Sequence, residues 1–117
     1  MTSLSLLEKQ QLQSVAEPIW KNIISASRDK DYARFSRGFS PELRGKLSEE
    51  HFAESCREYP LLTSVSDDFQ FIDVISRSGS MTLLWRVESN QFDGEFLGQL
   101  TLQKLEGGLQ ITGVSIT

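Results

Sequence analysis

Hydrophobic and polar positions follow two different periods along this chain of 117 residues. From Leu6 to Tyr59 the apolar residues recur every three or four positions, which is the spacing of one face of an α-helix. After Asp67 they alternate with polar residues, as in a strand with one buried face. The change of period predicts an α+β domain in which helices precede a β-sheet.

The first helix has a clear start signal and an internal proline. Ser5 and Glu8 match a capping box, so the helix is expected to begin near Leu6. Pro18 lies within the helical pattern and predicts a kink or a break, because proline lacks the amide proton and clashes with the preceding turn. The expected apolar stripe consists of Leu7, Leu12, Val15, Ile19, Ile23 and Ala26.

Shorter helices are expected to start after Asp31, Ser40 and Ser48, which are all residue types that cap helices. Pro41 follows Ser40 at the first helical position, where proline is favoured, and Pro60 ends the last helix. The apolar residues expected on the buried faces of these helices are Tyr32, Phe35, Phe39, Leu43, Leu47, Phe52, Cys56 and Tyr59.

Four strands are predicted in the second half of the chain: Phe69–Ser76, Met81–Glu88, Glu95–Leu105 and Leu109–Thr117. Short loops between consecutive strands favour an antiparallel meander. Strict alternation places Trp85 inside and Arg86 outside. Gly113 interrupts the alternation of the last strand and predicts a bulge or bend.

Composition and charge narrow the possible roles. The chain is 38% hydrophobic and 24% charged, which is typical of one globular domain spanning residues 1–117. A net charge of −4 disfavours binding to nucleic acid. Cys56 is the single cysteine, so no internal disulfide can form. With no signal-peptide pattern and no apolar run approaching about 20 residues, a cytoplasmic domain outside the membrane is expected.

Three residues carry reactive side chains in suggestive positions. Asp73 follows Phe69 and Phe71 on one strand face, so it is either a buried carboxylate with a raised pKa or, if the strand faces the other way or contains a bulge, an exposed one. His51 is the only histidine, and its acidic neighbours favour a solvated surface position. Cys56, on the face of Phe52, is expected to be buried and unreactive. No metal site or cofactor motif is expected.

Two further groups of side chains are candidates for binding. The segment 28–46 has an excess of positive charge that either binds an anionic ligand or forms a solvated surface, and the second reading is favoured. Aromatic side chains either fill the core or line a pocket for an apolar ligand. The candidate ligand-binding residues are Trp20, Tyr32, Phe52, Tyr59 and Trp85.

The order of these elements resembles the nuclear transport factor 2-like superfamily, in particular its small uncharacterised bacterial members. The positions that carry the resemblance are the helix from Trp20 to Ser27, Asp29-x-Asp31-Tyr32, Phe39-Ser40-Pro41 with Leu43 and Leu47, and Glu50 with Phe52. The resemblance implies a cystatin-like cone, in which N-terminal helices pack on a curved four-stranded antiparallel meander. It also implies a conical pocket and dimerisation through the outer face of the sheet.

The resulting expectation is a non-enzymatic domain that binds a small apolar or anionic molecule, or a protein partner, as a homodimer. The outer sheet face, with Leu84 and Leu97 among polar residues, is the expected dimer contact. The alternative is a small lyase or isomerase of the ketosteroid isomerase or dehydratase type. In it Asp73 acts as the base and Tyr32 or Tyr59 as a hydrogen-bond donor. A third reading is an assembly module with a filled core.

Overall fold

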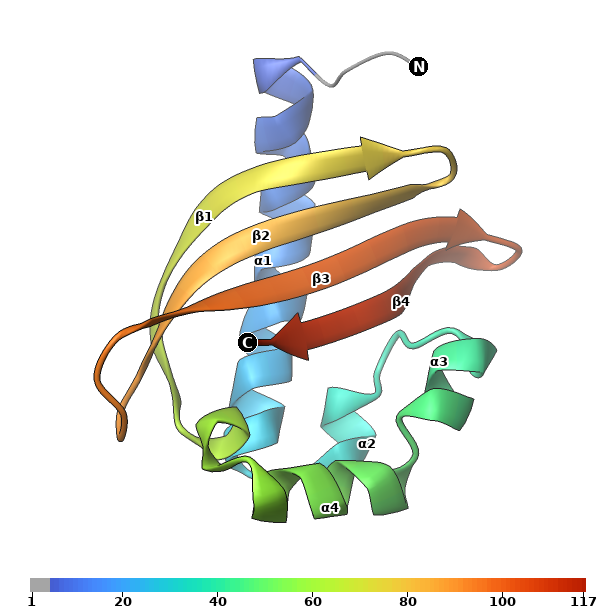
Figure 1. The fold of residues 1–117 in the computed structure, drawn as a ribbon. Helices are drawn as coiled ribbons and strands as arrows, with labels where there is room; N and C mark the ends of the chain where they lie inside the picture. The colour runs from blue at the N-terminus through green and yellow to red at the C-terminus, as the bar shows by residue number, and fades with distance from the viewer. Residues whose placement is uncertain (1–4) are drawn as a thin grey trace.

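The computed structural model describes residues 5–117 and places the helices before a four-stranded sheet, which confirms the α+β class (Figure 1). The helices are α1 (Leu6–Arg28), α2 (Tyr32–Phe35), α3 (Pro41–Lys46) and α4 (Glu49–Glu58), followed by the 3₁₀ turn η1 (Pro60–Thr63). The strands are β1 (Val65–Arg77), β2 (Ser80–Ser89), β3 (Glu95–Leu105) and β4 (Gly108–Ile116).

Helix α1 begins as predicted and continues where a break was predicted. Ser5 Oγ accepts a hydrogen bond from the Glu8 amide at 3.1 Å, and Glu8 Oε1 accepts one from the Ser5 amide at 3.0 Å. The hydrogen bond from the Ser5 backbone, followed by one from the Ser5 side chain, holds the pKa of the Glu8 carboxyl below its ordinary value. The predicted break at Pro18 is wrong, because α1 is one unbroken helix. Ala16 and Trp20, buried on either side of Pro18, anchor both halves of the helix in the core.

The buried face of α1 lies further along the helix than the predicted stripe. Its buried residues are Ala16, Trp20, Ile23, Ile24, Ala26 and Ser27. Leu7 and Val15, which were expected in the stripe, are 62% and 53% exposed. The reason is visible in Figure 1, where the N-terminal turns of α1 extend beyond the sheet.

The starts of the three shorter helices are confirmed. Asp31, Ser40 and Ser48 each accept a hydrogen bond from a backbone amide three residues further along. Tyr59 does not join the buried face of α4 as predicted. It is the residue after the last helical turn, with φ of −125°, and its side chain is 61% exposed.

The sheet is an antiparallel meander in the order β1-β2-β3-β4, as predicted, so β1 and β4 are its edges. Helix α1 covers one face of the sheet, and α2, α3 and α4 lie beyond the β4 edge (Figure 1). Trp85 is fully buried, whereas Arg86 is partly exposed and forms an ion pair of 2.8 Å with Glu95. The predicted orientation of β2 is therefore confirmed.

The pairing of both edge strands is irregular, at one place in β4 and at two places in β1, the first of them between Val65 and Phe69. In β4 the extra residue is Thr112, next to Gly113 where a bulge was predicted. In β1 the pairs Phe71–Trp85 and Asp73–Leu84 leave Ile72 as the extra residue. An extra residue reverses the inside–outside alternation beyond it.

Two tryptophans stack on each other between α1 and the sheet. Trp20 from α1 stacks on Trp85 from β2 with ring centroids 4.8 Å apart and planes 7° from parallel. Gly98 pairs with Trp85 across the sheet, and a Cβ atom at Gly98 would lie only 2.4 Å from the Trp20 ring. The close approach of α1 to β3 therefore requires glycine at this position. In the described part of the chain, no helix is long and apolar enough to cross a bilayer.

Candidate functional site

Three of the five aromatic candidates lie in the core or at the surface of the molecule. Trp20 and Trp85 fill the core and have no exposed area. Their indole N–H groups are buried and have no acceptor among the described residues. Tyr59 points into solvent at the end of α4. Trp20 and Trp85 are therefore core residues, and Tyr59 is a surface residue.

The other two aromatic candidates lie beside each other. Tyr32 donates a hydrogen bond from its hydroxyl to the Leu47 carbonyl at 2.6 Å, which ties α2 to the end of α3. The ring centroids of Tyr32 and Phe52 are 5.7 Å apart, and those of Phe52 and Phe35 are 4.4 Å apart. Of the five candidates, Phe52 alone lines the pocket described below.

Asp73 is exposed, which is the second of the two alternatives that the sequence left open, and a bulge in β1 is the reason. The bulge at Ile72 turns Val74 inward in its place, with Val74 only 8% exposed. Asp73 accepts a hydrogen bond from the Val74 amide at 2.7 Å and forms an ion pair with Lys9 at 2.8 Å. The hydrogen bond from Lys9, followed by that from Val74, lowers the pKa of Asp73, whereas the base hypothesis required it to rise.

Within the described residues, three of the six basic side chains of segment 28–46 form ion pairs with acidic groups: Arg28, Arg34 and Lys46. Arg28 donates to Asp67 at 3.0 Å, and Arg34 donates to Asp29 at 2.9 Å. Arg34 also donates to Ser25 Oγ at 2.8 Å. Charges that already have partners gain less from an anionic ligand, so this arrangement supports the solvated reading of the segment.

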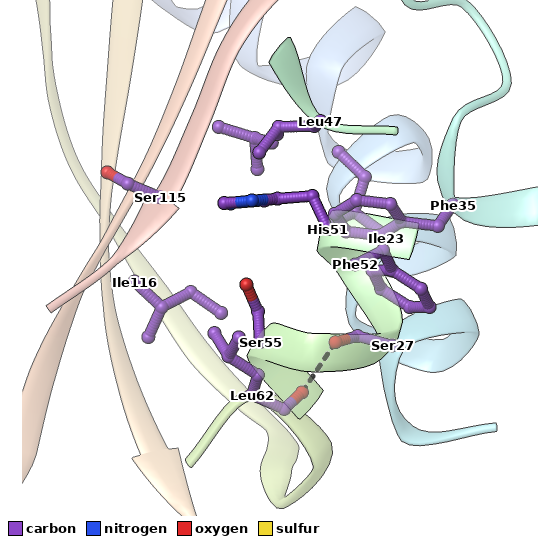
Figure 2. Close-up of a pocket in the computed structure, with 11 residues that line it drawn as sticks. Ile23, Ser27, Phe35, Leu47, His51, Phe52, Ser55, Leu62, Ser115 and Ile116 are labelled. Atoms are coloured by element: carbon purple, nitrogen blue, oxygen red, sulfur yellow. Dashed lines mark hydrogen bonds between the residues drawn. The ribbon is translucent and has the colours of Figure 1, made fainter. Parts of the chain in front are cut away.

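A cavity of about 100 Å³ lies between α4 and the end of β4 (Figure 2). Its apolar walls come from five elements: Ile23 of α1, Phe35 of α2, Phe52 of α4, Leu62 of η1 and Ile116 of β4. We call it the α4–β4 pocket. No candidate pocket at this place was predicted from the sequence, because its walls are far apart along the chain.

Two polar side chains of α4 border the α4–β4 pocket. Figure 2 shows the His51 ring extending from α4 towards β4, with the Ser55 hydroxyl beside it. These residues are one helical turn apart and therefore share a face. His51 is exposed, as predicted, but its ring also forms a side of the pocket. Within the described residues, neither side chain forms a hydrogen bond, whereas the nearby Ser27 Oγ donates to the Leu62 carbonyl at 2.6 Å.

Cys56 is buried on the inner face of α4, as predicted, and is 6% exposed. Burial raises the pKa of its thiol, which disfavours the reactive thiolate. Among residues 5–117, no group of three or more His, Cys, Asp or Glu side chains is arranged to hold a metal ion. The α4–β4 pocket is therefore the candidate site.

Comparisons with known proteins give a likeness of fold. No family model and no curated protein matches the chain. Among solved structures, the fold is similar to the solution structure of a SEC-C motif containing protein from Rhodopseudomonas palustris, with a TM-score of 0.51 and 10% sequence identity. The match covers 78% of this chain and 70% of that one. At this identity the likeness concerns the fold alone.

The expected membership of the nuclear transport factor 2-like superfamily is wrong. The similar structure is that of a SEC-C motif containing protein, and neither other comparison supports the superfamily. The assignment depended on element order and apolar positions. Packing alone imposes those features on many α+β domains, so they do not identify a family.

Proposed function

We propose that this domain is a non-enzymatic binding module that receives an apolar group in the α4–β4 pocket. The observation that carries the proposal is an open cavity with mostly apolar walls, bordered by two polar side chains of α4, next to a buried hydrophobic core. Protein interiors are close-packed, and voids larger than a water molecule are few in each domain. A cavity that opens to the surface with apolar walls is the default binding-site hypothesis.

The volume limits the kind of group that fits. Pockets for drug-sized ligands measure about 300–1,000 Å³, and a cavity of about 150 Å³ accommodates benzene. At about 100 Å³ the α4–β4 pocket suits a single small apolar group, such as one branched side chain or one end of a small molecule. His51 and Ser55 provide polar groups at its border that could orient what binds.

The lyase or isomerase alternative receives no comparable support. Its base, Asp73, is exposed and paired with Lys9, and its candidate donor Tyr59 lies in solvent. No carboxylate is among the residues that line the α4–β4 pocket, so none there orients the His51 imidazole as general acid–base catalysis by histidine commonly requires.

Methyl NMR spectroscopy with toluene as a small apolar probe tests the proposal. Saturable shifts are expected for the methyl groups of Ile23, Leu62 and Ile116, which line the pocket. The variant Ser55→Leu should fill the pocket and abolish these shifts. Ala53→Leu is the matched control, because it adds a leucine to an exposed position of the same helix. Absence of saturable shifts in the unmodified protein would exclude the proposed pocket function.

The proposal includes a homodimer formed through the outer face of the sheet. Leu84 and Leu97 are partly exposed there, and Ile72, the extra residue of the β1 bulge opposite Leu84, is 54% exposed. Burial of these side chains between two copies would remove apolar surface from water. Light scattering over a range of concentrations tests this part, and a mass that stays monomeric throughout would contradict it.

A further inference from the structure

The outer edge of β4 is covered along its first part. The Ile111 amide donates to the Gly38 carbonyl at 2.8 Å, and the Ser40 amide donates to the Ile111 carbonyl at 2.9 Å. The segment that enters α3 therefore pairs with this part of β4 as a short parallel bridge. Another chain cannot add to the edge at this point.

The second part of the same edge is open. Leu97 and Thr117 exchange both backbone hydrogen bonds, each at 2.9 Å. Because antiparallel pairs alternate, the backbone groups of Val114 and Ile116 point away from β3. Within the described residues, no hydrogen bond reaches the N–H or C=O groups of Val114 and Ile116 on that side. Edges of this kind are templates for an added strand.

The open edge and the α4–β4 pocket adjoin each other, because Val114 and Ile116 also line the pocket. We infer that an extended peptide segment of a partner protein adds to β4 as a fifth strand and inserts one branched aliphatic side chain into the α4–β4 pocket. This inference rests on the proposed function and names the occupant of the α4–β4 pocket. In such strand addition, main-chain hydrogen bonds provide affinity and a side-chain pocket provides specificity.

The charge beside the pocket specifies the peptide further. Helix α4 carries Glu49, Glu50, Glu54 and Glu58 against a single arginine, Arg57, and no lysine. Glu54 and Glu58 follow His51 by one and two helical turns, so they lie on the same side of α4 as His51. A peptide with lysine or arginine around its aliphatic residue complements this surface.

The same charges argue against a second copy of this chain as the occupant. Pairing of two β4 edges would bring two acidic α4 helices to one interface, and each chain has a net charge of −4. Like charges placed against each other at an interface are unfavourable. A basic segment of a different protein meets no such repulsion.

The test uses a capped heptapeptide in which a central leucine is flanked by alternating lysine and threonine. Its titration into the labelled protein should shift the amide resonances of Val114 and Ile116 together with the methyl resonances of Leu62. Replacement of the central leucine by aspartate, or N-methylation of the peptide backbone beside it, should raise the Kd at least tenfold. Replacement of every lysine by glutamate should raise the Kd at least as much. Added salt should weaken the binding of the lysine peptide.

One protein variant tests the edge, and a second tests the pocket. Val114→Pro removes an amide that has no partner within the described residues, which an edge strand tolerates, and should abolish peptide binding. Because Val114 also lines the pocket, the N-methylated peptide, which leaves the protein unaltered, assigns this loss to the edge hydrogen bonds. Ser55→Leu should abolish binding of both toluene and the peptide, and Ala53→Leu should change neither. Circular dichroism spectra that match the unmodified protein would show that each variant is folded.

Three outcomes would overturn the inference. Toluene binding without peptide binding would leave the proposed function in place and remove the peptide as occupant, whereas loss of both would remove the function itself. Equal affinity for the leucine and aspartate peptides would show that the pocket does not select the peptide. Self-association that disappears in Val114→Pro would assign the edge to a second copy of the chain.

Discussion

The Trp20–Trp85 stack and the α4–β4 pocket are two regions of the same molecule with opposite packing. At the stack, large rings meet a glycine, and no space remains between α1 and the sheet. At the pocket, Ser27 and Ser55 occupy positions where larger side chains could close the gap between α4 and β4. One region is filled to the limit and the other is left open.

Because of this difference, changes at the stack are expected to affect stability, and changes at the pocket are expected to affect binding. The stack contributes apolar burial that holds α1 on the sheet, so changes there should affect folding first. The pocket walls face an open space, so a larger side chain there has room that a side chain added at the stack does not have. The variants below exploit this contrast, beginning with the largest expected effect.

The largest effect is expected from Trp20→Ala. The substitution removes a fully buried ring and leaves Trp85 facing a cavity. Large-to-small changes of aromatic residues in a core cost about 3–5 kcal/mol of unfolding free energy. Urea denaturation followed by circular dichroism measures the loss. A loss below about 1 kcal/mol would mean that the stack is not the centre of the core.

Gly98→Ala should be the next most damaging change, although it adds only a methyl group. The added Cβ would lie 2.4 Å and 2.6 Å from two atoms of the Trp20 ring. Overpacking of this kind costs about 1–3 kcal/mol. Gly45→Ala is the control, because a Cβ there has no neighbour within 4 Å and the residue lies in α3. The control should be neutral or slightly stabilising, and equal losses in both variants would refute the packing argument.

Ser55→Leu should raise the free energy of unfolding, whereas the two preceding variants lower it. A leucine at this position extends into the α4–β4 pocket, and cavity-filling substitutions commonly raise stability by about 0.5–2 kcal/mol. Thermal denaturation compared with Ala53→Leu measures the gain against a leucine on the exposed side of the same helix. Destabilisation by Ser55→Leu alone would show that the pocket is smaller or more rigid than its volume suggests.

The smallest effect concerns Asp73 and Lys9, which lie outside both regions. The folded-state pKa of Asp73 is lowered, so its contribution to stability is present above the ordinary value of about 3.9 and is lost as the pH falls through the folded-state value. Lys9→Met should therefore lower the Tm slightly at neutral pH and leave it nearly unchanged in strong acid. If the difference in Tm between Lys9→Met and the unmodified protein grew as the pH fell, this would contradict the lowered pKa of Asp73.

Local signals in the sequence predicted much of this fold. The cap residues Ser5, Asp31 and Ser48 act within one helical turn, and the alternation around Trp85 acts within one strand, so both could be recognised without tertiary information. The unbroken helix at Pro18 could not, because packing on both sides of the proline outweighs its local preference.

The candidate site was harder to predict than the fold. The bulge at Ile72 reverses the side-chain alternation of β1, so it removed Asp73 from the core, and periodicity alone cannot locate such an insertion. The α4–β4 pocket depends on five elements that meet only in three dimensions. The spacing of His51 and Ser55 on one helix face was the local signal available, and it does not reveal what lies opposite.

Both tryptophans of this chain belong to a single stack, which has a consequence for spectroscopy. Intrinsic tryptophan fluorescence reports on one place only, the contact between α1 and the sheet. Neither indole is among the residues that line the α4–β4 pocket, so fluorescence should follow unfolding and remain unchanged when a ligand binds there. Emission from the same sample therefore provides an optical measure of folding that is independent of occupancy.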